Sequence, residues 1–178
     1  MDTYSDIELV QRSVSGDARA FEQLVTRHYL TVYRISYKWC GVKQDAEDIA
    51  QEVFVNLARK LKTFRQRSSF STWLFRIVIN TAKDFTRKCA TKHAYELAFA
   101  FEHKPENPQP SEAHHNNAKL YKEIAKLPEK QRLAIVLVLG EGLSHKEAAH
   151  VLSCPEATIS WRIFQARKKL KKSLEHLR

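Results

Sequence analysis

The chain has 178 residues, with 30 Lys and Arg against 20 Asp and Glu, and a formal net charge of +10. This charge favours a polyanionic partner, either nucleic acid or an acidic membrane surface. No apolar run approaches the roughly 20 residues needed to cross a bilayer, and the acidic start MDTYSDIELVQ is unlike a signal peptide. The widely spaced Cys40, Cys89 and Cys154 suit reduced thiols in a cytoplasm.

Helices are predicted almost throughout, because apolar residues recur every three or four positions and the chain has only 4 Gly and 5 Pro. The expected helices are Asp6–Val14, Asp17–Trp39, Asp45–Leu61, Phe70–Lys92, Ala118–Lys126, Pro128–Gly140, Ser144–Leu152 and Pro155–Leu174. A polar, Pro-rich stretch from Lys104 to Ser111 separates the first four from the rest. We therefore expect an all-α protein of two small helical domains, residues 1–92 and 118–178, joined by a flexible linker over 93–117.

The helix expected from Asp45 carries an acidic stripe. Asp45, Asp48 and Glu52 are spaced i, i+3 and i+7, so they share one face. Acidic residues in a first helical turn also interact favourably with the helix dipole, which explains the two aspartates without any function. Glu52 lies two turns further on, and an acidic stripe on a basic protein suits docking to a basic protein partner. Both interpretations stay open on the residues alone.

A basic block follows, with ten Lys and Arg and a single acid between Arg59 and Lys92. Its helix carries a stripe of polar and basic residues at i, i+4, i+7 and i+11, namely Arg76, Asn80, Lys83 and Arg87. The polar loop before the helix consists of Arg65, Gln66, Arg67, Ser68 and Ser69. Basic groups follow phosphates, and polar or aromatic pockets hold unstacked bases. Of the interleaved aromatic residues, Trp73 and Phe85 are expected inside the core. The block indicates DNA binding without separating single-stranded from duplex DNA.

The segment LSHKEAAHVLSCPEATISWRIFQARKKL predicts a helix-turn-helix. Ser144 and Glu147 have the spacing of a capping box, small alanines allow two helices to cross closely, and the break at 153–155 is three residues long. The outer face of the second helix carries Thr158, Trp161, Arg162, Gln165, Lys168, Lys169 and Lys172. A helical hairpin with a solvated basic face is the alternative, although an outward Trp161 favours a partner surface.

Patterns of catalysis and metal binding are missing from the sequence. Cys89 and His93 are spaced i, i+4, but no second pair at zinc-site spacing accompanies them. There is no phosphate-binding glycine loop, no His-Glu-x-x-His and no nucleophile elbow. We expect no enzymatic activity, no cofactor, no metal and no small-molecule substrate.

Four blocks of the chain resemble the extracytoplasmic-function sigma factors, a small two-domain group within the sigma-70 family, and the detail is most similar to the envelope-stress type. The blocks are GDARAFEQLVTRHY, DAEDIAQEVFVNLARKL, FSTWLFRIVINTAKDF and LPEKQRLAIVLVLGEGLSHKEAAHVLSCPEATISWRIFQARKKL. They cover nearly the whole chain outside the linker. The resemblance implies sigma region 2, a helical bundle, over 1–92, and sigma region 4, the helix-turn-helix, over 118–178.

The resemblance also implies a role for each surface. The first domain would bind the β′ coiled coil of core RNA polymerase through Asp45, Asp48, Gln51 and Glu52. It would open the −10 promoter element: the loop Arg65–Ser71 would hold a flipped-out base of the non-template strand, and Asn80, Lys83 and Arg87 would line the DNA path. The residues assigned to the −10 DNA are Arg65, Gln66, Arg67, Ser68, Ser69, Arg76, Asn80, Lys83 and Arg87. The second domain would contact the β flap and read the −35 element through Glu156, Thr158, Ser160, Trp161, Arg162, Gln165, Lys168 and Lys169.

For proteins of the envelope-stress type, a membrane-anchored anti-sigma factor is the usual partner. The resemblance therefore implies a bacterial cytoplasmic protein that such a partner holds at the inner membrane. The chain departs from the family at the recognition helix, where a Gly-Thr-Val-Lys/Arg-Ser-Arg run is common and this sequence has Ala157-Thr158-Ile159-Ser160-Trp161-Arg162. Gln165 also stands where Arg is common. The −35 preference of relatives is therefore not transferred to this chain.

Two other functions compete with this interpretation. A helix-turn-helix repressor or activator would use the second domain, but it would leave Glu52 and the basic block without a role. A small nuclease would need a metal or an acid and base cluster beside the basic stripe, and the sequence contains no such pattern.

Overall fold

The computed structural model of the chain describes residues 4–99, 120–121 and 123–175. All the elements in these ranges are helical, as predicted. The first lobe (residues 4–99) contains α1 (Asp6–Val14), α2 (Ala18–Cys40), α3 (Lys43–Lys60), the 3₁₀ turn η1 (Leu61–Thr63) and α4 (Phe70–Phe99). The second lobe (residues 120–121 and 123–175) contains helical residues at 120–121 and 123–125, α6 (Glu129–Ile135), the π-helical turn η2 (Val136–Gly140), α7 (His145–Leu152) and α8 (Glu156–Glu175).

Side-chain caps determine where α1 and α2 begin. The Glu8 amide donates to the Ser5 hydroxyl at 3.3 Å, and the Ser5 amide donates to the Glu8 carboxylate at 2.7 Å. Asp17 accepts hydrogen bonds from two backbone amides in the first turn of α2. Gly41 ends α2 in the left-handed conformation with a φ of 73°, which glycine adopts without steric cost.

Two helices extend beyond their predicted bounds. α3 begins two residues before Asp45 and has no side-chain cap. α4 does not end at Lys92 but continues to Phe99, into residues that the sequence assigns to the linker. No Gly or Pro interrupts the sequence of α4 before Pro105, so nothing local stops the helix at the expected point. The rest of the expected linker, residues 100–117, lies outside the described residues.

The apolar stripe of each helix forms the core. In the first lobe the buried side chains include Leu24, Val32, Ile35, Ile49, Val53, Leu57, Leu74 and Val78. In the second lobe they include Leu133, Leu137, Ala148, Ile159, Ile163 and Ala166. Tyr29 has the helical spacing of the apolar stripe of α2 but is 40% exposed. Its ring stacks on the rings of Tyr33 and Phe54 instead.

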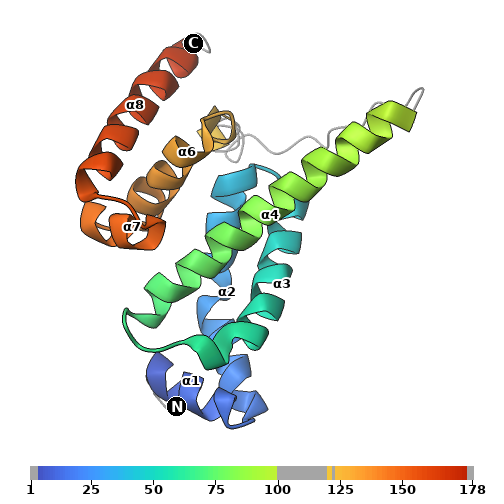
Figure 1. Cartoon of the computed structure of the whole chain (residues 1–178), viewed down its shortest axis with the longest axis vertical. Coiled ribbons are helices and arrows are strands. Elements are labelled where there is room, and N and C mark those ends of the chain that lie inside the picture. The colour runs from blue at the N-terminus through green and yellow to red at the C-terminus, as the bar shows by residue number, and fades with distance from the viewer. Residues whose placement is uncertain (1–3, 100–119, 122, 176–178) are drawn as a thin grey trace.

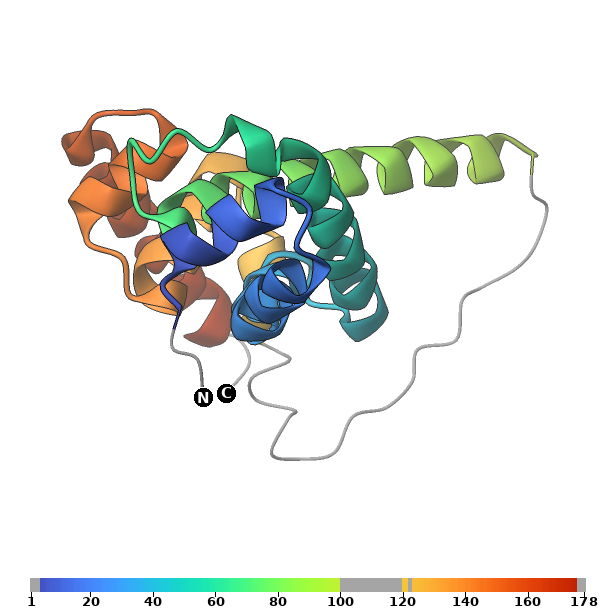
Figure 2. The ribbon, with the colours of Figure 1, turned by 90° about the horizontal axis from the view of Figure 1, so that it is seen from below.

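The two lobes pack directly against each other (Figure 1 and Figure 2). η2 contacts α2, and α7 contacts α4. Buried apolar residues from both lobes belong to one continuous cluster. The sequence predicts two domains but contains no sign of this contact between them.

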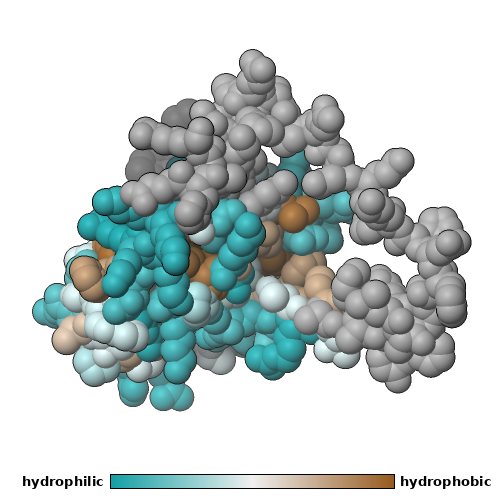
Figure 3. All heavy atoms as spheres, turned by 90° about the horizontal axis from the view of Figure 1, so that it is seen from above, coloured by the Kyte–Doolittle hydropathy of each residue, from teal (hydrophilic) through white to brown (hydrophobic). Residues whose placement is uncertain are grey.

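The face drawn in Figure 3 is mainly hydrophilic over the described residues, with hydrophobic residues showing in smaller areas between them. Of the helices that the structure describes, none is both long and apolar enough to span a membrane.

Candidate polymerase and DNA interfaces

The acidic stripe of α3 lies on the surface of the first lobe. Asp48 and Gln51 are exposed, while Asp45 and Glu52 are partly buried. Glu52 accepts a hydrogen bond from Lys88 Nζ of α4 at 3.2 Å. Partial burial raises the pKa of the Asp45 carboxyl group, and the nearby charge of Asp48 raises it further. By their spacing, Asp45, Asp48 and Glu52 share one face of α3, and the charge of Glu52 is paired with that of Lys88.

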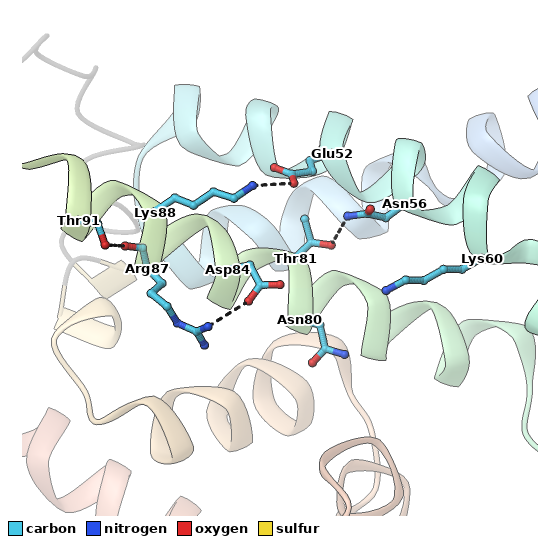
Figure 4. A pocket seen from close by; sticks show the side chains of 9 residues that line it. All are labelled: Glu52, Asn56, Lys60, Asn80, Thr81, Asp84, Arg87, Lys88 and Thr91. Atoms are coloured by element: carbon cyan, nitrogen blue, oxygen red, sulfur yellow. Dashed lines mark hydrogen bonds and ion pairs between the residues drawn. The ribbon is translucent and has the colours of Figure 1, made fainter.

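A groove of about 710 Å³ lies between α3 and α4 (Figure 4). Its lining consists of Glu52, Asn56, Lys60, Asn80, Thr81, Asp84, Arg87, Lys88 and Thr91. Asn56 Nδ2 donates to Thr81 Oγ1 at 3.2 Å across the groove, and this bond links the two helices. Arg87 and Asn80 point away from α3 in Figure 4, and Arg87 is 78% exposed. The groove joins the acidic stripe of α3 to the basic residues of α4.

The polar loop before α4 exposes its basic residues. Arg65, Gln66 and Arg67 are exposed, and Gln66 has a φ of 55°, a conformation that few non-glycine residues adopt. Ser69 accepts a hydrogen bond from the Thr72 amide at 3.2 Å and so caps α4. The Ser69 hydroxyl is therefore engaged in holding the helix start, whereas the two arginines remain available at the surface.

Three aromatic residues that flank this loop in the sequence, Phe64, Phe70 and Trp73, pack against one another. The ring centroids of Phe64 and Trp73 are 5.2 Å apart, and those of Phe64 and Phe70 are 5.6 Å apart. Phe70 is only 3% exposed, while Trp73 and Phe85 are partly buried and pack against the core. The expectation that Trp73 and Phe85 lie inside is confirmed in part, and the cluster anchors the loop on a rigid base.

The basic stripe of α4 is divided between solvent and the second lobe. Asn80 and Arg87 are exposed as predicted. The Arg76 guanidinium donates to the backbone carbonyl of His150 in α7. Lys83 Nζ forms an ion pair with Glu129 of α6 at 2.8 Å. The four residues share one side of α4, but only two of them face water.

The helix-turn-helix of the second lobe is built as the sequence predicts. The Glu147 amide donates to the Ser144 hydroxyl at 3.2 Å, and the Ser144 amide donates to the Glu147 carboxylate at 2.8 Å, so the predicted capping box of α7 is confirmed. Ser153 ends α7 in the left-handed conformation with a φ of 51°. Ala148 and Ile159 are fully buried where α7 meets α8. This geometry leaves the outer face of α8 on the surface.

The predicted DNA-reading residues of α8 differ in exposure. Glu156, Ser160, Trp161, Lys168 and Lys169 are exposed, whereas Thr158, Arg162 and Gln165 are partly buried. Arg162 donates to Cys154 Sγ at 3.5 Å, and Ser160 Oγ lies 2.8 Å from His145 Nδ1. The tip of α8 is therefore tied to the turn and to α7.

Sequence reasoning missed Phe164, which is 64% exposed beside Trp161 at 58%. The two are spaced i, i+3 and share the outer face of α8. Helical spacing alone places Phe164 on this face, three residues after Trp161 and away from the buried Ile159, Ile163 and Ala166.

Comparison with known proteins identifies the family. Residues 24–91 match the family described as Sigma-70 region 2, and residues 117–170 match the one described as Sigma-70, region 4. The RNA polymerase sigma-H factor of Pseudomonas aeruginosa is 35% identical, covering 97% of this chain and 95% of the relative. The ECF RNA polymerase sigma-E factor of Escherichia coli is 33% identical, covering 97% of this chain and 96% of the relative. The chain is an extracytoplasmic-function sigma factor.

Solved structures agree with this assignment. CnrH, solved in complex with the cytosolic domain of CnrY, has a TM-score of 0.72 and 29% identity to this sigma factor, covering 96% of this chain and 97% of CnrH. The sigma factor RpoE from Bartonella quintana, solved with the anti-sigma factor NepR, has a TM-score of 0.70 at 24% identity, covering 89% and 98% of the two chains, and shares the fold.

Membership of this family defines the general role of the protein. Sigma factors bind core RNA polymerase and promoter DNA to start transcription at selected promoters, and they are not known as enzymes. Region 2 lies in the first lobe, and the described part of region 4 lies in the second. Among the residues whose side chains the structure describes, no three His, Cys, Asp or Glu lie close enough together to hold a metal ion.

Proposed function

We propose that this sigma factor docks on core polymerase through the acidic face of α3, opens the −10 element with the loop at 65–69 and the exposed side of α4, and reads the −35 element with α8. The observation that carries this proposal is the acidic face itself. A plain DNA-binding protein of net charge +10 gains nothing from gathering carboxylates on one surface. Gathered carboxylates do benefit a protein that must also bind a basic surface on another subunit.

The partial burial of Asp45 supports the docking role. Burial and the neighbouring Asp48 both disfavour the charged form of Asp45, so its ionisation opposes folding of the isolated chain. A basic partner would remove that penalty on binding. We assign Asp45, Asp48, Gln51 and Glu52 to the β′ coiled coil on this basis.

For the −10 element, the proposal rests on an exposed basic loop fixed to a rigid aromatic base. Arg65 and Arg67 are free to follow the phosphates of a single strand, while the Phe64, Phe70 and Trp73 cluster holds the loop in place. Holding an extruded base offsets the few kcal/mol of unstacking that opening requires. Gln66 and Ser68 would contact the base, and Asn80 and Arg87 would guide the strand along α4.

For the −35 element, α8 would enter the major groove with its outer face towards the bases. Lys168 and Lys169 would hold phosphates, and Arg162 and Gln165 would read base edges. The outer face also carries Glu156, Thr158, Ser160 and Trp161. Joining two modest DNA-binding surfaces in one chain raises the effective concentration of the second once the first is bound.

The partner that holds this sigma factor inactive is proposed to be a membrane-anchored anti-sigma factor. Support comes from CnrH, which was solved with the cytosolic domain of CnrY. The sigma factor itself would act in the cytoplasm and catalyse no reaction.

The docking assignment is tested by charge reversal on α3. Asp48→Lys with Glu52→Lys should weaken binding to core polymerase on the order of tenfold or more, because both changes place cations against a basic surface. Binding is measured by competition with the wild-type chain for purified core. The matched control is Glu22→Lys with Glu47→Lys, which changes the net charge equally at exposed or partly exposed positions off the acidic face. Unchanged affinity of the Asp48 and Glu52 variant, with helicity retained by circular dichroism, would refute the assignment.

A repressor and a sigma factor are separated by one further measurement. A sigma factor supports promoter-specific transcription only together with core polymerase. Specific binding of the free chain to promoter DNA without any effect on transcription by core would favour a repressor.

A further inference from the structure

An aromatic ring lies at each end of the polar loop at 65–69. Phe64 comes directly before the loop and Phe70 directly after it, and their ring centroids are 5.6 Å apart. Phe70 is also the first residue of α4 and is almost completely buried. Because the loop between the two rings is short, the position of Phe70 determines where the loop lies on the first lobe.

A buried histidine of α2 contacts Phe70. The ring centroids of His28 and Phe70 are 5.1 Å apart, and the two ring planes are tilted by 58°. His28 is only 9% exposed, and its Nε2 lies 3.0 Å from Oδ2 of Asp6 in α1. Since a carboxylate only accepts hydrogen bonds, Nε2 carries a proton and donates it to this bond. The polymerase and DNA surfaces described above make no use of this histidine.

The carboxylate of Asp6 is fixed by a second cation. Its Oδ1 accepts a hydrogen bond from Arg27 Nη1 at 2.6 Å, and Arg27 Nη2 donates to the Tyr4 carbonyl at 2.8 Å. The capping box that begins at Ser5 orders the turn of α1 in which Asp6 lies. The Asp6 oxygen that faces His28 therefore has a defined position, and it fixes the orientation of the imidazole ring.

We infer that His28 is a positioning residue for promoter opening: it links Asp6 of α1 to Phe70 and so holds the loop at 65–69 ready to capture a base. This inference rests on the proposed assignment of that loop to the −10 DNA. α1 also contacts η1, which leads into the other end of the loop (Figure 1). A loop with both ends held loses less conformational entropy when DNA orders it. His28 is buried, so it acts through Phe70 rather than on the DNA.

His28→Ala tests the inference in the holoenzyme formed by core polymerase and the full chain. The substrate is a promoter that the wild-type holoenzyme transcribes, and permanganate reactivity of unpaired thymines reports opening. The opening rate should fall several-fold. Affinity for core polymerase and for the unopened duplex should stay at the wild-type values, because the acidic face of α3 and the outer face of α8 do not include the loop.

Ile35→Ala is the matched control, compared at a temperature at which circular dichroism shows both variants folded. Ile35 is also buried and lies two turns further along α2, where Trp39 Nε1 donates to Thr86 Oγ1 in a later part of α4. This variant should lose stability and open the promoter at the wild-type rate. Equal slowing by Ile35→Ala and His28→Ala would overturn the inference, because loss of core packing would then explain both.

Two substitutions of Asp6 separate positioning from packing without removing a buried ring. Asp6→Ala removes the acceptor of His28, so opening should slow, although less than in His28→Ala. Asp6→Asn presents an amide oxygen to the same Nε2 and should restore most of the wild-type rate. Equal opening rates in Asp6→Asn and Asp6→Ala would contradict the link through His28, as would a wild-type rate in His28→Ala.

Arg65→Ala with Arg67→Ala distinguishes this inference from the assignment on which it rests. If the double variant opens the promoter normally, the loop assignment and the role of His28 fail together. If it loses opening while His28→Ala opens at the wild-type rate, the loop assignment stands and only the positioning role fails.

Discussion

Two aromatic residues on the outer face of α8 distinguish this recognition surface. Trp161 and Phe164 expose 58% and 64% of their area on a helix proposed to enter the major groove. Large apolar groups in that position suit the C5 methyl group of thymine, which only thymine presents there. Ser160 and Gln165 beside them are polar, so the proposed base reading by this helix would combine apolar and hydrogen-bonding contacts.

Trp161→Ser should therefore weaken the preference for thymine at one −35 position. We expect a loss of about 1 kcal/mol, or roughly fivefold in affinity, on promoter DNA. Replacing that thymine by uracil removes only the methyl group, so it should weaken the wild-type chain and leave the variant unaffected. Lys168→Ser is the matched control, because a phosphate contact should be lost equally on both DNAs. Equal sensitivity of wild type and Trp161→Ser to uracil would contradict the thymine contact.

The thiol of Cys40 illustrates how burial decides reactivity. Burial raises its pKa to about 11, and the thiol donates to the Val42 carbonyl at 3.2 Å. At pH 8 only roughly one molecule in a thousand carries the thiolate, which is the reactive form. Iodoacetamide labelling followed by mass spectrometry should modify the exposed Cys89 well before Cys40 in the folded chain. Comparable labelling rates for the two cysteines would indicate that the structure around Cys40 opens readily and exposes the thiol.

At the scale of elements, local sequence signals predicted most helix bounds but missed the start of α3 and the end of α4. The capping box of Ser144 and Glu147 could be predicted from the sequence because its hydrogen bonds form within four consecutive residues. The end of α4 at Phe99 could not be predicted in this way, because no Gly or Pro marks a helix end between Lys92 and Pro105. α3 also begins earlier than its first aspartate, since a helix can start at a residue without a side-chain cap.

The capping box of α7 should contribute measurably to stability. Ser144→Ala should lower the free energy of unfolding by about 1 kcal/mol, which urea denaturation would detect. The hydrogen bonds from Ser144 hold the pKa of Glu147 below its usual value. A lowered carboxyl pKa gives stability that is complete above the unfolded pKa and is lost as the pH falls through the folded pKa. The difference between wild type and Ser144→Ala should therefore shrink on acidification, and a difference that grows with acid would contradict this role.

At the scale of the whole molecule, the sequence predicted both lobes but not their contact. Each lobe has its own periodic apolar stripe, so its core is implied by short-range patterns. Lys38 and Glu141 are 103 residues apart and belong to no motif, and no periodicity predicts that they meet. The same limit applies to Arg76 and Lys83, whose sequence pattern indicates a DNA-facing stripe although both face the second lobe.

The contact between the two lobes should persist at high salt concentration. The Debye length falls to about 3 Å at 1 M salt, which weakens surface pairs far more than buried ones. Lys38 and Glu141 are largely buried, whereas Glu129 is half-exposed. The radius of gyration measured by small-angle scattering should therefore stay constant up to about 1 M sodium chloride. Expansion at high salt would indicate that exposed pairs, not the buried one, hold the lobes together.

The contact of Lys38 with Gly140 and Glu141 also constrains how this protein can evolve. Region 2 supplies the lysine, and region 4 supplies the glycine and the glutamate. A hybrid that joins this region 2 to the region 4 of a relative contains only half of a buried ion pair, unless that region 4 also has a partner for Lys38. Recombination between related genes would thus tend to produce chains whose halves each fold but no longer pack together, and selection would keep the two halves as one inherited unit.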